Sequence, residues 1–331
     1  MPDESAATRA ASSAVREGAM IADRNNRLRM WFTGAAAADT LNGLVTNDVA
    51  ALAPGRGVYA AALTPKGKVI ADVRILRLDD AWLADVSPAA APGWSAMIRK
   101  YVNPRLAKYE DRSATTGDVG AYGPDALRVL RESTGSSDAI PDAMAAHSGV
   151  TISLDGAPVL VVRTPDFGVE GYDAIGPREV TDRLREELVA RGGVPATAEA
   201  LDIARIEAGR PELGRDMDEN TLAQEVDMDR LGAISYQKGC YTGQETVARV
   251  HFRGHVNRQL RGLRFESGGP AAAGTELRDA GGKVVGAVRS GIRSPRLGAI
   301  ALALVRHEVE PGAIVTVDGQ QATVVELPFR D

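Results

Sequence analysis

From about Arg258 onward, the residue pattern changes and the sequence divides into six short apolar runs. Gly, Pro or Asp separates these runs, and many of their residues are β-branched. Short runs of this kind read as strands, and six in succession predict a small barrel or sandwich. We therefore expect a separate C-terminal β-barrel over residues 256–331. The runs are RQLRGLRF, GTELRD, KVVGAVRS, LGAIALALV, AIVTVDG and QATVVELPF.

The longer part, residues 19–255, mixes strands and helices. Residues 57–86 alternate apolar and polar side chains around a Thr-Pro-Lys-Gly turn, which predicts a strand meander. Three-to-four spacing of apolar residues predicts helices over 35–52, 91–102, 123–133 and 176–193. A meander followed by helices indicates an α+β fold and not a doubly wound sheet. We expect this region to hold two interleaved subdomains.

The first 18 residues lack the apolar middle of a secretory signal, and we expect them to be a flexible leader. No apolar stretch approaches the roughly 20 residues of a spanning helix. The formal net charge of -5 gives no global field that would attract nucleic acid or an anionic membrane. With a single cysteine and no possible internal disulfide, the sequence indicates a cytoplasmic protein without membrane or direct nucleic-acid partners.

That single cysteine, Cys240, lies in the polar, glycine-flanked stretch QKGCYTGQE. Two readings are open. A lone cysteine is commonly an inert core residue, but the neighbours here are not aliphatic, which favours an accessible and reactive thiol. Lys238 would favour the thiolate if its ammonium group were close.

Several other chemistries have little support. The sequence contains neither a Gly-x-Gly-x-x-Gly element after a strand nor a phosphate loop. No hydrolytic triad is credible, and we expect no metal site, because Arg253-Gly254 argues against a helix that would place His251 and His255 on one face.

Four further polar positions are candidates for a site. Asn47 belongs to a Thr-Asn-Asp turn, which can equally be an ordinary cap. Asp72 lies in the aliphatic strand VIADVRIL, facing either solvent or a cleft. Arg205 and Glu225 lie in a charged stretch that a solvated helix face would also explain.

Taken in order, LNGLVTNDVAAL, GVYAAALTPKGKVIADVRIL, RIEAGRPELG, AQE and QKGCYTGQETVARVHFRG resemble the YgfZ-type folate-binding family. That family is related to the T-protein of the glycine cleavage system, the tetrahydrofolate-dependent aminomethyltransferase. The K-G-C-Y-x-G-Q-E signature carries most of the resemblance, which runs from about residue 20 to the end. It implies a three-subdomain ring of mixed α/β folate-binding subdomains with a C-terminal β-barrel, and tetrahydrofolate as the ligand of a central channel.

The resemblance also implies roles for individual residues. Cys240 would be the signature thiol beside the folate channel, and Asp72 the acid near the folate; these two are the catalytic candidates. In the aminomethyltransferases a Glu grips the pterin, and Val169 stands at that place here, with Glu170 one residue away. Ala223 stands where a proline is usual before the acid Glu225. The folate-binding candidates are Asn47, Asp72, Arg205, Glu225, Lys238, Tyr241 and Gln244.

Two functions follow from the resemblance. The first is a folate-binding accessory protein for iron-sulfur cluster assembly or repair, whose partners are iron-sulfur proteins or assembly factors and which indirectly supports tRNA-modifying radical enzymes. The alternative is a tetrahydrofolate-dependent aminomethyltransferase of the glycine cleavage type. A third class is a structural scaffold whose pocket is degenerate. Whether the chain is an enzyme is therefore left open at this point.

Overall fold

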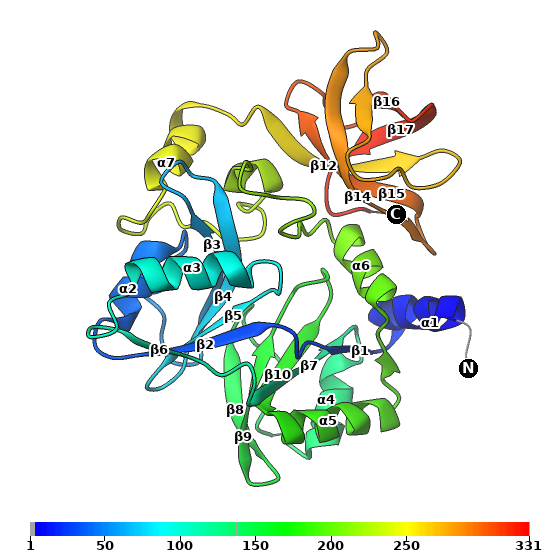
Figure 1. Cartoon of the computed structure of the whole chain (residues 1–331). Helices are drawn as coiled ribbons and strands as arrows, with labels where there is room; N and C mark the ends of the chain where they lie inside the picture. The colour runs from blue at the N-terminus through cyan, green and yellow to red at the C-terminus, as the bar shows by residue number, and fades with distance from the viewer. Residues whose placement is uncertain (1–3, 137, 331) are drawn as a thin grey trace.

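The structure is a computed structural model that describes residues 4–136 and 138–330. It consists of two β-sheets with helices against them and a closed barrel formed by the C-terminal strands (Figure 1). The strand meander and the six-stranded barrel predicted from the sequence are both confirmed. Within the described part of the chain, no helix is long and apolar enough to cross a membrane.

The first sheet has five strands in the order β3-β4-β5-β2-β6. Tyr109 and Trp94, from β6 and from the helix that covers the sheet, both pack against Phe32 in its core. Its elements are β2 (Leu28–Thr33), α2 (Ala37–Leu44), β3 (Gly57–Leu63), β4 (Val69–Arg77), β5 (Trp82–Val86), α3 (Ala91–Tyr101) and β6 (Lys108–Asp111).

The second sheet has six strands in the order β11-β1-β7-β10-β9-β8. Helices α4 and α5 pack against this sheet (Figure 1). After β6, the last strand of the first sheet, the chain continues into β7 of the second. Its elements are β1 (Met20–Asp23), β7 (Thr116–Tyr122), α4 (Ala126–Thr134), β8 (Gly149–Leu154), β9 (Ala157–Arg163), β10 (Gly171–Pro177), α5 (Arg178–Ala190) and β11 (Val194–Pro195).

The segment between β11 and the barrel contains helices joined by loops. It holds α6 (Ala198–Glu207), the short 3₁₀ helix η1 (Ala223–Val226) and α7 (Gln244–Arg253). Side chains of this segment, of β3 and of the barrel form one apolar core, which includes Tyr59, Ile206, Leu260 and Leu327. The barrel strands are β12 (Arg258–Phe265), β13 (Glu276–Arg278), β14 (Val284–Ser294), β15 (Gly298–Arg306), β16 (Ile314–Val317) and β17 (Gln320–Val325).

Two sequence-based expectations are corrected. The residues expected to be a flexible leader contain helix α1 (Glu4–Glu17), because Ala11, Ala14 and Val15 give it an apolar face that packs near α6. The helix expected over 35–52 ends at Leu44, since Val45 instead pairs with Ala62 of β3 as an isolated bridge.

Candidate functional site

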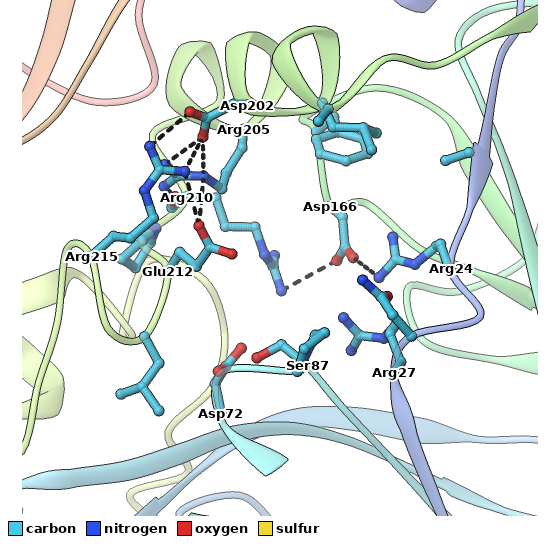
Figure 2. Close-up of a pocket in the computed structure, with 18 of the residues that line it drawn as sticks. Arg24, Arg27, Asp72, Ser87, Asp166, Asp202, Arg205, Arg210, Glu212 and Arg215 are labelled. Carbon is cyan, nitrogen blue, oxygen red and sulfur yellow. Dashed lines mark hydrogen bonds and ion pairs between the residues drawn. The ribbon is translucent and has the colours of Figure 1, made fainter. Parts of the chain in front are cut away.

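A cavity of about 280 Å³ lies where β4, the β9–β10 loop, α6 and the segment after α6 meet (Figure 2). The chain contributes lining residues from six separate stretches, so the polar side chains of the cavity come together only in the folded protein. Its lining includes Arg24, Tyr59, Asp72, Asp166, Phe167, Arg205 and Arg210.

Asp72 contributes the carboxyl group on the β4 wall. Residues two apart on a strand share a face, and Asp72 and Arg74 both line the cavity. Tyr59, on the neighbouring strand β3, donates its hydroxyl to Asp72 Oδ2 at 3.0 Å. Asp72 Oδ1 is buried and has no hydrogen-bond partner among the residues that the structure describes. A buried oxygen without a partner is costly, which marks it as an acceptor available to a ligand.

Asp166 is the acid on the opposite wall, and the sequence analysis did not identify it. It lies in the β9–β10 loop, with Arg24 Nη2 at 3.1 Å and Arg210 Nη2 at 3.2 Å. Burial alone would raise the pKa of Asp166, but Arg210, Arg74 and Arg24 hold it well below its usual value. Asp166 therefore stays ionised and fixes two arginines at the cavity.

Arg210 extends from the segment after α6 toward Asp166 (Figure 2). Its guanidinium carbon lies 4.3 Å from the centroid of the Tyr59 ring, a cation–π contact. Arg210, the second Arg of RIEAGR, was not among the site residues expected from the sequence.

Beneath the cavity lies a buried ionic cluster. Arg74 pairs with Asp85 and lies 2.6 Å from Asp173 Oδ2. Burial, followed by the charge of Asp173, raises the pKa of Asp118 well above its usual value. This cluster joins the two sheets and holds Arg24 and Arg74 rigidly at the cavity floor.

His147 packs behind Tyr59, with ring centroids 6.1 Å apart. Its side chain is almost fully buried, and Nδ1 has no hydrogen-bond partner within the described residues. Burial lowers the pKa of His147 to about 4, so the imidazole is neutral at pH 7.

Of the residues expected from the sequence, Asp72 and Arg205 line this cavity. Arg205, at its far end, is engaged by Asp216 at 2.5 Å and Asp202 at 2.8 Å. Glu170 does not line it. The Glu170 carboxylate instead binds Arg163 through two hydrogen bonds, of 3.0 and 2.8 Å, and accepts one from Tyr172.

Three expected binding residues brace the fold outside the cavity. Lys238 Nζ donates to the carbonyl oxygens of Val45 and Asn47, each at 2.8 Å. Asn47 Nδ2 donates to the backbone carbonyl of Tyr59 at 2.8 Å. Glu225 accepts from the backbone amide of Leu222, capping η1, and pairs with Arg258 at 3.1 Å.

The remaining expected residues, in the segment QKGCYTGQE, also lie outside the cavity. Cys240 is exposed, Tyr241 is buried in the core shared with the barrel, and Gln244 begins α7. None of the three lines the cavity. The expectation that the thiol and Asp72 border one hollow is corrected, because Lys238 and Tyr241 anchor the segment to the α2–β3 connection and to the barrel core instead.

A second cavity, of about 930 Å³, lies between the two sheets at the opposite end of β4. Leu160 and Ile175 are among its apolar lining, and its Arg112 is already paired with Glu110 at 2.7 Å. It shows no buried unpartnered carboxyl group among the described residues, which makes the Asp72 cavity the better candidate site. No group of three or more His, Cys, Asp or Glu side chains suited to a metal ion is found in residues 4–136 and 138–330.

Comparisons with known proteins agree with this architecture. Residues 2–236 match the family model described as the GCVT N-terminal domain, and residues 258–331 match the glycine cleavage T-protein C-terminal barrel domain. Similar curated proteins include two aminomethyltransferases. The protein from Cutibacterium acnes is 30% identical, and the match covers 99% of this chain and 92% of that protein. The protein from Thermosynechococcus vestitus is 31% identical, and the match covers 89% of this chain and 79% of that protein.

A solved structure shares the fold. The glycine cleavage system aminomethyltransferase T from Bartonella henselae superposes with a TM-score of 0.86 at 21% identity, covering 98% of this chain and 89% of that one. The mixed α/β arrangement with a C-terminal six-stranded barrel is thus a T-protein fold.

Proposed function

Because the chain belongs to the glycine cleavage T-protein family, we propose that it is a tetrahydrofolate-dependent aminomethyltransferase of the glycine cleavage type. The curated relatives reported above carry the name aminomethyltransferase, and each is covered over more than two thirds of its length. They favour this reading over the iron-sulfur accessory role, which was the leading expectation from the sequence.

The observation that carries the proposal is the arrangement of Asp72. Its Oδ2 is held by the Tyr59 hydroxyl, and its Oδ1 is buried at the cavity without a partner among the described residues. A carboxyl oxygen in that state is suited to an N–H donor of a bound ring. Tyr59 fixes the carboxyl orientation, so the acceptor is preorganised before the ligand arrives.

The residues present fit a reduced pterin. Its pyrimidine ring is planar, rich in N–H donors and carries a carbonyl acceptor, while this cavity offers Asp72 as acceptor, Arg210 as donor and Phe167 as an apolar surface. The volume of about 280 Å³ is close to the lower end of small-molecule sites, roughly 300 Å³. Tetrahydrofolate would supply the two nitrogens that accept the one-carbon unit, one in the reduced ring and one in its link to the benzoyl group.

In the reaction, this chain's residues would orient and polarise the reactants. Asp72 would align the acceptor nitrogen and stabilise positive charge that develops beside it, an electrostatic contribution that protein sites make most strongly when water is excluded. The buried arginines around Asp166 would keep the opposite wall rigid.

A direct assay tests the function. The purified chain is incubated with tetrahydrofolate and an aminomethyl donor, and formation of methylenetetrahydrofolate and release of ammonia are followed. We expect turnover that depends on both substrates. Binding of tetrahydrofolate without any turnover, across free and carrier-bound amine donors, would contradict the enzymatic proposal.

A second candidate is the accessory role in iron-sulfur cluster assembly or repair that the YgfZ resemblance implies. The observation that favours it is the exposure of Cys240 within K-G-C-Y-x-G-Q-E. In that role the thiol would act on the protein surface, with iron-sulfur proteins as partners, and not in the folate cavity. Activity of cluster-dependent enzymes in cells carrying Cys240→Ser separates it from the transferase.

A further inference from the structure

Arg210 has an unusual position among the arginines of the cavity. Its guanidinium is stacked over Tyr59 at 4.3 Å and lies 3.2 Å from Asp166. Asp166 is itself tied to Arg24 at 3.1 Å. The orientation of the Arg210 guanidinium is therefore fixed, because the Tyr59 ring packs against one of its faces and Asp166 pairs with its Nη2.

The backbone around Arg210 is fixed as well. Its amide donates to the carbonyl of Arg205 at 3.0 Å, and its own carbonyl accepts from Arg205 Nη1 at 2.8 Å. The preceding Gly209 has φ +64, and a Cβ there would lie 2.7 Å from Leu327 of the C-terminal segment. A side chain longer than hydrogen would not fit at Gly209, so the position from which Arg210 enters the cavity is set by the contact with Leu327.

Most other arginines at the cavity are committed to carboxylates. Arg205 holds Asp202 and Asp216, and Arg215 holds Asp202 at 2.7 Å. Arg27 binds Asp85 through Nε at 2.8 Å. By contrast, the contacts of the Arg210 guanidinium within the described residues are the single ion pair and the Tyr59 ring. A guanidinium has five N–H donors, so several of those on Arg210 remain for a ligand.

Arg210 and Asp72 share Tyr59 as a neighbour: the Arg210 guanidinium lies over the Tyr59 ring, and the Tyr59 hydroxyl donates to Asp72. Burial lowers the pKa of Arg210, but Asp166, Tyr59 and Asp72 more than offset this and raise it. The cavity therefore presents three neighbouring groups to a ligand: an acceptor at Asp72 Oδ1, the hydroxyl and ring of Tyr59, and a cationic donor at Arg210.

We infer that Arg210 determines ligand specificity by donating to the ring carbonyl of the bound pterin, so that the cavity selects a 4-oxo ring over a 4-amino ring. This inference rests on the proposed function, since it concerns the same ligand. A guanidinium pairs with a carbonyl oxygen but opposes an amino group, which also presents N–H donors.

The opposite selectivity is the natural alternative. If the Asp72 carboxyl alone governed recognition, the 4-amino ring would be favoured, because it is more basic and has additional N–H groups for a carboxylate. The sign of the preference therefore distinguishes recognition by Arg210 from recognition by Asp72 alone.

The test uses folic acid and aminopterin, which differ in carrying an oxo or an amino group at position 4 of the ring. Calorimetric titration of the full chain measures both dissociation constants, alongside tetrahydrofolate. We expect folic acid to bind at least about tenfold more tightly than aminopterin, as for a hydrogen bond from a charged donor. Arg210→Met should abolish or invert this preference, and Arg210→Lys should restore part of it.

Arg163→Met is the matched control. It also removes an arginine paired with a carboxylate near the β9–β10 loop, namely Glu170, but it does not line the cavity. The full preference should remain in this variant. Equal binding of the two compounds by the unmodified chain, or an unchanged preference in Arg210→Met, would overturn the inference while leaving the function proposal intact. Failure of tetrahydrofolate and folic acid alike to bind would overturn both.

Discussion

Tyr59 and Asp72 lie on adjacent antiparallel strands, and the Tyr59 hydroxyl donates to Asp72 Oδ2 over 3.0 Å. This bond leaves Oδ1 as the oxygen that faces the ligand. Tyr59→Phe removes the donor without removing the ring, so Arg210 keeps its stacking surface. We expect the turnover number to fall about tenfold, consistent with losing one hydrogen bond to a charged group, with a smaller change in KM. Steady-state kinetics measures the two separately. A change in KM alone would argue against a role for Tyr59 in orienting Asp72.

Asp166 and Glu170 lie four residues apart but have different expected contributions. Asp166→Asn leaves Arg24 and Arg210 without their shared carboxylate, and we expect it to lower the free energy of unfolding by about 3–5 kcal/mol. Glu170→Gln affects a partly exposed pair with Arg163, for which a change below about 1 kcal/mol is expected. Urea denaturation measures both. Comparable losses in the two variants would show that Asp166 does not anchor the cavity.

His147 should make the folded protein sensitive to mild acid. The folded state holds the imidazole neutral down to about pH 4, whereas the unfolded chain takes up a proton near 6.5. The unfolded state therefore binds more protons between these values, and stability falls as the pH falls. Relative to His147→Asn, which suits the positive φ of 59° at this residue, the unmodified chain should lose about 2–3 kcal/mol between pH 7.5 and 4.5. Parallel denaturation curves for the two proteins would contradict the assignment.

Cys240 separates the two functional proposals. Its side chain is exposed and does not line the cavity, so Cys240→Ser should keep transferase activity within about twofold. If the chain instead serves iron-sulfur assembly through this thiol, the same variant should lose support of cluster-dependent enzymes in cells. A loss of transferase activity of more than about tenfold would place the thiol in the reaction after all.

Local patterns predicted much of the fold. The alternation over 57–86 and the turn at Thr64–Gly67 indicate β3 to β5, and the six C-terminal runs correspond to the six barrel strands. The helix over 35–52 failed because Val45 and Thr46 make contacts outside the helix: Val45 pairs with Ala62, and the Thr46 hydroxyl donates to the carbonyl of Ala233. Tertiary contacts of this kind override helical spacing.

The site was less accessible to sequence reasoning. Asp72 stood out as an acid within an aliphatic strand, and it does line the cavity. Asp166, Arg210 and Tyr59 did not stand out, because each is a single residue whose contacts form only in the folded chain: Arg210 and Asp166 lie 44 positions apart, and Tyr59 reaches Asp72 from the neighbouring strand. The QKGCYTGQE motif is anchored in this structure to the α2–β3 connection through Lys238 and to the core shared with the barrel through Tyr241. A notable motif and a ligand cavity need not coincide.

The proposed function requires that the Asp72 cavity bind tetrahydrofolate through the unpartnered oxygen of Asp72. Calorimetric titration of tetrahydrofolate into the unmodified chain, Asp72→Asn and the control Asp79→Asn, whose aspartate is exposed and outside this cavity, tests it most directly. We predict saturable binding at one site, at least about tenfold weaker in Asp72→Asn because an amide donor would replace the acceptor, and unchanged in Asp79→Asn. Absence of saturable binding, or equal affinity in all three proteins, would contradict the account.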